Sequence, residues 1–94
     1  MQDYELVLIF NPEEIKKETE AVKLAKKLIK PADIKLGKVD NWGSRQMAYP
    51  IKNHASGWYL LMEVQVPSEK LVTLHKTIRA EDRVLRHFLV RTSK

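Results

Sequence analysis

Apolar residues recur along the chain with periods that predict four strands and two helices. Residues 4–10 and 58–66 carry apolar side chains on both parities of an extended chain, which is typical of strands in the middle of a sheet. Residues 34–51 and 84–91 read as two further strands. Pro50 cannot donate a hydrogen bond to a neighbouring strand, so the strand that contains it is expected at a sheet edge.

Two segments have the apolar spacing of amphipathic helices. The first helix is expected to begin with Asn11 as its cap and Glu14 completing a capping box, and to end before Pro31. Its apolar stripe consists of Ile15, Ala21, Val22, Ala25, Leu28 and Ile29. Ser68 is expected to cap the second helix. The stripe of that helix consists of Leu71, Leu74 and Ile78.

Turn residues separate these elements. Trp42 and Gly43 predict a bulge within the second strand, and residues 53–57 predict the turn that follows it. Two registers stay open for the last strand, in which the core-facing residues are either Leu85, His87 and Leu89 or Val84, Arg86, Phe88 and Val90.

The order strand–helix–strand–strand–helix–strand predicts a ferredoxin-like α+β sandwich over residues 1–94. It has a four-stranded antiparallel sheet with both helices on one face. The first and third strands are expected to be central, and the second and fourth to be edges.

Composition narrows the class of protein. The 94 residues hold 17 Lys and Arg against 12 Asp and Glu, a formal net charge of +5, and 44% of them are hydrophobic. This balance fits one small soluble domain that attracts polyanions, among which nucleic acid is the leading candidate. The chain has no cysteine, which excludes disulfides and thiolate sites and suits a reducing cytoplasm. No apolar run approaches the roughly 20 residues that span a bilayer, so no membrane contact is expected.

Patterns typical of catalysis or metal binding are missing from the sequence. The histidines at positions 54, 75 and 87 fall in a predicted turn, helix and strand, and none has a partner at metal-ligand spacing. Each of the three glycines is isolated, so there is no glycine-rich phosphate loop. We therefore expect no catalytic residue, no metal site and no small-molecule substrate.

Arginines are concentrated near the end of the second helix and the start of the last strand, where three of them are expected to form one patch. A guanidinium group donates paired hydrogen bonds that suit phosphate. The residues expected to contact RNA are Arg79, Arg83, Arg86, Arg91, Lys52 and His54. The alternative is an ordinary solvated surface with local ion pairs, such as Glu81 with Arg79.

The sheet face opposite the helices is predicted to stay partly apolar. Tyr59 and Leu61 point there from the third strand, and Val7 and Ile9 do so from the first. An uncovered apolar face usually marks a partner surface. Stacking of RNA bases is less favoured, because the first strand supplies no exposed aromatic side chain. We therefore expect Tyr59 and Leu61 to contact a protein partner.

The second strand carries a specific motif. Residues 43–51 read GSRQMAYPI, and residues 57–59 read GWY. This motif resembles that of the bacterial small-subunit ribosomal protein S6 family, in which Gly-x-Arg-x-Leu/Met-Ala-Tyr-Pro-Ile precedes a Gly-aromatic pair. Further matches at residues 4–5, 11–12, 84–86 and 91–92 extend the resemblance over essentially the whole chain.

The resemblance implies a ferredoxin-like structural protein of the 30S subunit in the cytoplasm, without catalytic activity or cofactor. It implies binding to the central domain of 16S ribosomal RNA as a heterodimer with ribosomal protein S18 during 30S assembly. The family's partner surface involves the second strand. Carried onto this sequence, it points to Trp42, Arg45, Gln46 and Tyr49. A role of residues 49–51 in bending the strand is an alternative of equal weight, and both roles are compatible.

Two other classes of function stay open at this stage. A ferredoxin-like dimerisation or regulatory module would self-associate through its open sheet face, and a stable homodimer without RNA would identify it. A small hydrolase would need a nucleophile paired with a base, for which the sequence offers no candidate.

Overall fold

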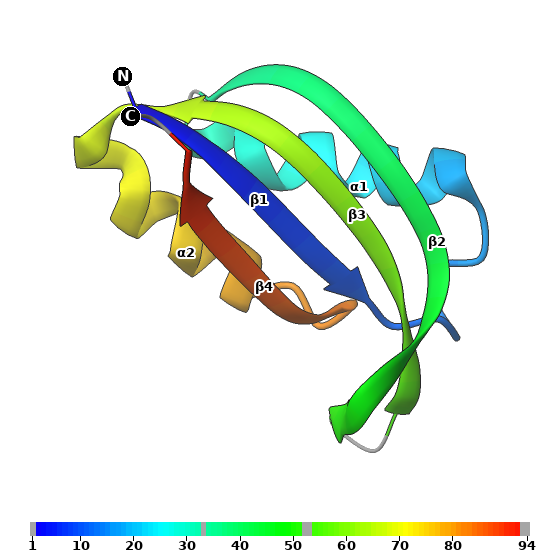
Figure 1. The fold of residues 1–94 in the computed structure, drawn as a ribbon. Helices are drawn as coiled ribbons and strands as arrows, with labels where there is room; N and C mark the ends of the chain where they lie inside the picture. The colour runs from blue at the N-terminus through cyan, green and yellow to red at the C-terminus, as the bar shows by residue number, and fades with distance from the viewer. Residues whose placement is uncertain (1, 33, 52–53, 93–94) are drawn as a thin grey trace.

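Four antiparallel strands form one sheet, and two helices cover one of its faces (Figure 1). The structure is a computed structural model that describes residues 2–32, 34–51 and 54–92, and only the backbone within 47–51. In chain order the elements are β1 (Gln2–Phe10), α1 (Glu18–Ile29), β2 (Lys35–Ile51), β3 (His54–Val66), α2 (Leu71–Arg79) and β4 (Val84–Arg91). Short 3-10 turns follow α1 at Lys30–Ala32 and precede α2 at Ser68–Lys70.

The strands lie in the order β2-β3-β1-β4. The two segments that are apolar on both parities are therefore the central strands, and the strand that contains Pro50 is an edge, as its missing N–H requires. The predicted ferredoxin-like sandwich is confirmed, together with its central and edge strands.

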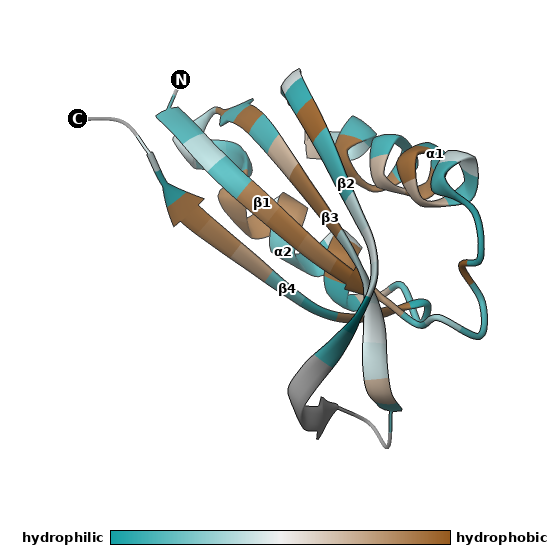
Figure 2. Cartoon of the chain, turned by 45° about the vertical axis from the view of Figure 1, so that its right-hand side comes forward, coloured by the Kyte–Doolittle hydropathy of each residue, from teal (hydrophilic) through white to brown (hydrophobic). Residues whose placement is uncertain are grey.

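The core lies between the sheet and the helices. Leu6, Leu8 and Phe10 of β1 have no exposed surface, and Leu74 and Ile78 of α2 pack against them as part of one buried cluster. The buried residues of α1 are Ala21, Leu24, Ala25, Leu28 and Ile29. In Figure 2 the hydrophobic colour covers the second half of β1 and much of β4, while α1 alternates between hydrophobic and hydrophilic residues.

The predicted start of the first helix is wrong. Asn11 caps a single turn instead: its Oδ1 accepts a hydrogen bond from the Glu13 N–H at 2.9 Å, and its carbonyl accepts one from the Ile15 N–H at 2.9 Å. Ile15 then turns into the core with 2% of its surface exposed. The chain is extended at Lys17 (φ −135°, ψ 147°), and α1 begins only at Glu18. Burial of Ile15 thus outweighs continuation of the helix from the capped turn.

Two further predictions about element ends are corrected. Residues 54–57 belong to β3 rather than to a turn, because they pair with β2, as in the partners Arg45 and Gly57. Residue 53 lies outside the described residues. Ser68 does not cap α2, which follows a 3-10 turn and has Lys70 at its N-cap with no side-chain cap. The Lys70 N–H donates to the Pro67 carbonyl at 2.8 Å, so backbone groups close this turn.

A bulge near the start of β4 settles the register of that strand. Ile9 pairs with Arg86 but Phe10 pairs with Val84, so one extra residue lies in β4. An extra residue inverts the alternation of side chains between the two faces. The residues on the helix side are therefore Val84, His87 and Leu89, and those on the open side are Leu85, Arg86, Phe88 and Val90. Each of the two expected registers is right for only part of the strand.

Candidate protein- and RNA-binding surfaces

The sheet face without helices carries a continuous set of apolar side chains, as the sequence predicts. Ile9 of β1 and Leu85 of β4 are buried there, and Val7 and Tyr59 pack against them. Beside this cluster, on β4, Phe88 is 42% exposed and Val90 is 55% exposed. One of the two registers left open by the sequence places both of these side chains outside, and the structure agrees with that register here.

A second bulge places Trp42 on the same face. Gly43 has φ of 73°, a backbone conformation that side chains with a Cβ rarely adopt, and its N–H donates to Asn41 Oδ1 at 3.0 Å. The Trp42 ring stacks on Tyr59 with centroids 6.3 Å apart and planes inclined at 14°. Trp42 Nε1 donates to Asp40 Oδ2 at 3.1 Å, which fixes the ring, and 46% of its surface is exposed. The predicted bulge is confirmed.

Four of the six residues expected to bind a protein partner line one hollow. They are Trp42, Arg45, Gln46 and Tyr59, around a volume of about 410 Å³. Arg45 Nε donates to the Trp42 carbonyl at 3.1 Å, which holds the arginine beside the indole ring. Leu61 lines a neighbouring hollow of about 240 Å³ on the same face. The side chain of Tyr49 lies outside the described residues.

The arginines expected to contact RNA do not form one patch. Arg86 lies on the open face of the sheet, with its guanidinium carbon 5.1 Å from the ring centroid of Phe88. Arg79 ends α2 on the helix side, where its charge acts on His87. Arg79 is therefore on the helix side of the sheet because it belongs to α2, whereas the bulge in β4 turns Arg86 to the open face.

Arg83 and Arg91 are each engaged with a neighbouring side chain. Arg83 Nε donates to Glu81 Oε2 at 2.7 Å and its Nη2 to Oε1 at 3.1 Å. This paired hydrogen bond lowers the pKa of Glu81 and raises that of Arg83. Arg91 Nη2 donates to Gln2 Oε1 at 2.8 Å, at the other end of β4. The expected local ion pair thus exists, but with Arg83 in place of Arg79.

Two predicted RNA contacts remain. His54 begins β3 and is half-buried, and Lys52 lies outside the described residues.

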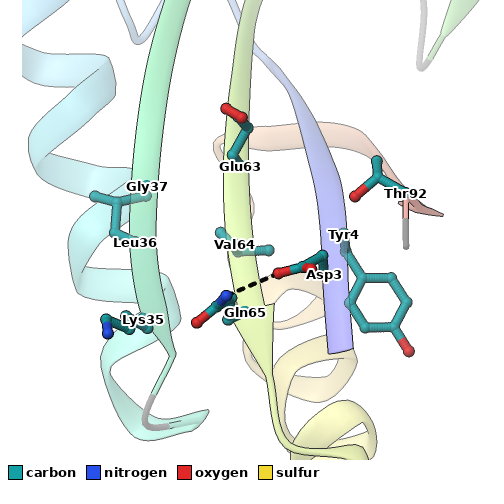
Figure 3. A pocket seen from close by; sticks show the side chains of 9 residues that line it. All are labelled: Asp3, Tyr4, Lys35, Leu36, Gly37, Glu63, Val64, Gln65 and Thr92. Carbon is teal, nitrogen blue, oxygen red and sulfur yellow. Dashed lines mark hydrogen bonds between the residues drawn. The ribbon is translucent and has the colours of Figure 1, made fainter. Parts of the chain in front are cut away.

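A larger hollow of about 450 Å³ opens at the other end of the sheet, beside the start of β1 (Figure 3). Gln65 Nε2 donates to Asp3 Oδ1 at 2.8 Å across it. A Cβ at Gly37 would lie 3.2 Å from the Glu63 carbonyl, so β2 and β3 approach each other closely here. None of the residues expected to bind RNA or a protein partner lines this hollow.

A histidine pair was missed in the sequence. His75 of α2 and His87 of β4 lie with Nδ1 and Nε2 2.9 Å apart, although they are 12 positions apart in the chain. Only the packing of α2 on β4 brings them together, so no spacing rule could have found them. Among the described residues there is no group of three or more His, Cys, Asp or Glu able to hold a metal. In the same part of the chain, no helix is long and apolar enough to cross a membrane.

Comparison with known proteins agrees with this architecture. A family model described as ribosomal protein S6 matches residues 3–91. The crystal structure of the 30S ribosomal protein S6 from Thermotoga maritima is similar, with a TM-score of 0.84 and 28% sequence identity. The match covers 97% of this chain and 87% of that one.

Proposed function

The chain belongs to the ribosomal protein S6 family, and from that premise we propose that it binds 16S ribosomal RNA together with ribosomal protein S18. The family consists of structural proteins of the small ribosomal subunit, and the fold is that of a 30S subunit protein. We propose that the chain acts in assembly of the central domain of that RNA and has no catalytic activity. The match over residues 3–91 is the observation that carries this proposal.

The open face of the sheet is the surface we propose for S18. It combines the hollow beside Trp42 with the half-exposed side chains on β4. A patch of apolar residues rimmed by polar groups is typical of a protein interface. Arg45 and Gln46 supply polar groups at the rim, and the edge strand β2 offers unpaired backbone groups to a neighbouring chain. The residues proposed for this contact are Trp42, Arg45, Gln46, Tyr49, Tyr59 and Leu61.

The RNA contacts are proposed to come from residues on both sides of β4. Arg79 and Arg86 are exposed and present the planar guanidinium that suits phosphate. Two guanidinium nitrogens of Arg83 donate to Glu81, and the third is proposed to contact a phosphate. Arg91 is proposed as a further contact on β4. Lys52 and His54 are proposed to add a further contact.

The coupling between the two partners is the first test. We expect this chain alone to bind a central-domain fragment of 16S ribosomal RNA weakly, and to bind it at least about tenfold more tightly with S18 present. Filter binding at one fixed salt concentration measures both affinities. Equal affinities with and without S18 would count against the heterodimer. A stable homodimer in sedimentation, without RNA, would instead favour self-association through the open face.

The arginine assignments have their own test. Each phosphate contact that is removed is expected to reduce the slope of log affinity against log salt by roughly 0.7 to 0.9. Arg86→Gln and Arg79→Gln should each show this reduction in the presence of S18. Lys26→Gln is the matched control, because it removes the same charge from the exposed side of α1. An equal change in the control would show that only net charge matters and would refute the assignments.

A further inference from the structure

His75 and His87 form a pair that is not among the residues proposed to contact RNA or S18. His75 Nδ1 lies 2.9 Å from His87 Nε2, with ring centroids 5.2 Å apart and planes inclined at 44°. Both side chains are half-buried, so each ring keeps part of its surface in solvent. The pair lies between α2 and the edge strand β4, which also pack together through Ile78 and Val84 in the buried core.

We propose that His75 and His87 form a two-histidine site for a divalent transition-metal ion, which joins α2 to β4. Neutral imidazole is the commonest protein ligand of such ions. Two nitrogens that are each about 2.05 Å from one ion lie about 2.9 Å apart at a right angle and about 3.3 Å apart at the tetrahedral angle. The observed 2.9 Å is the length of an ordinary hydrogen bond between the two rings. It also lets both nitrogens reach one ion at a right angle, which is the geometry of Cu²⁺ and Ni²⁺ rather than of Zn²⁺.

The protons of the pair can be arranged for metal binding without net proton release. In the hydrogen bond between two neutral rings, one N–H points at the lone pair of the other ring. Metal binding moves that proton to the far nitrogen of its own ring, which is Nε2 for His75 or Nδ1 for His87. Both facing nitrogens then offer lone pairs to the ion. Water completes the coordination, since the described part of the chain holds no third ligand grouped with these two.

The groups around the pair have two opposing effects on metal binding. Burial lowers the pKa of His87, and His75 and Arg79 lower it further, which favours the neutral form of this ring. The positive charge of Arg79 also opposes a bound cation. The site is therefore an exchangeable one, and its affinity should depend on the residue at position 79.

Titration of the full chain with Ni²⁺, without a polyhistidine tag, tests the site. The chain has three histidines, so their ring-proton NMR signals report on each position separately. The signals of His75 and His87 are expected to shift or broaden before that of His54. If these two signals are unperturbed by millimolar Ni²⁺, the proposal is wrong.

Variants separate a built site from weak surface binding. His75→Gln and His87→Gln should each weaken Ni²⁺ binding at least about tenfold, whereas His54→Gln, the matched control, should leave it unchanged. Arg79→Gln keeps both ligands and removes the opposing charge, so it should tighten binding roughly two- to fivefold. Equal weakening in all three histidine variants, or no gain in Arg79→Gln, would overturn the proposal. Thermal unfolding with Ni²⁺ and then with excess chelator should show a reversible rise of the midpoint in the unmodified chain.

Discussion

Replacement of Trp42 by alanine is expected to weaken binding of ribosomal protein S18 more than any other single change on the open face. The indole ring stacks on Tyr59 and is fixed by a hydrogen bond to Asp40. It lines the hollow that Arg45 and Gln46 also line. Large aromatic side chains placed in this way dominate many protein interfaces.

The size of the effect follows from the surface that Trp42 still exposes. A tryptophan presents roughly 250 Å² at most, and 46% of its surface is exposed here. Covering that part removes about 115 Å² from water, which contributes about 3 kcal/mol at roughly 25 cal/mol per Å². Alanine retains a small share of this contribution, so the affinity for S18 should fall roughly 30- to 100-fold.

The fold itself should tolerate the change. Trp42 lies on an edge strand and loses one aromatic stack, which costs about 1 kcal/mol. Val72 provides the matched control, because it is an apolar residue with 64% exposure on α2, away from the open face. Isothermal titration with S18 should show the loss in Trp42→Ala and no change in Val72→Ala. Wild-type affinity in a folded Trp42→Ala variant would refute the placement of the partner on this face.

Three further predictions concern stability. Gly43→Ala should cost about 1–2 kcal/mol because of backbone conformation, since φ is 73° and a Cβ there meets nothing within 4 Å; Gly43→Asn should cost less, and equal losses in urea unfolding would contradict this. Stability should fall as pH drops below about 6.5, because burial, His75 and Arg79 lower the pKa of His87 and the unfolded state then binds more protons. In His87→Gln the urea midpoint should change less between about pH 7.5 and about pH 5 than in the unmodified chain. An equal change of the midpoint with pH in both proteins would exclude His87 as the cause. Leu8→Ala should cost about 2–5 kcal/mol, because Leu8 is completely buried; a loss well below this range in urea unfolding would mean that the core closes around the missing side chain.

The arrangement of the strands could be predicted because several local features require the same topology. Apolar residues on both parities place β1 and β3 in the centre, and Pro50 places β2 at an edge. Gly43 indicates the bulge in β2, because a positive φ is favourable for a residue without a Cβ. Each of these features depends on a few neighbouring residues, which is why sequence alone was sufficient.

The start of α1 could not be predicted in the same way. Asn11 does satisfy the N–H of Glu13, so the local capping rule is correct as far as one turn. Whether the helix continues depends on how Ile15 is buried in the core. That burial depends on how α1 packs against the sheet. Tertiary packing therefore moves the helix start from the capped turn to Glu18.

The bulge in β4 has the largest consequence for function. The bulge contains no glycine that would indicate it in the sequence. Its extra residue, Leu85, is buried beside Ile9. The bulge nevertheless turns Arg86 to the face proposed for S18, while Arg79 stays on the helix side. One flat RNA surface cannot reach both guanidinium groups across the sheet. RNA contacts on both sides of β4 therefore require the nucleic acid to pass around this edge strand, and a protein on the open face would then border the RNA at Arg86. That shared border gives a physical reason for the two partners to bind more tightly together than separately.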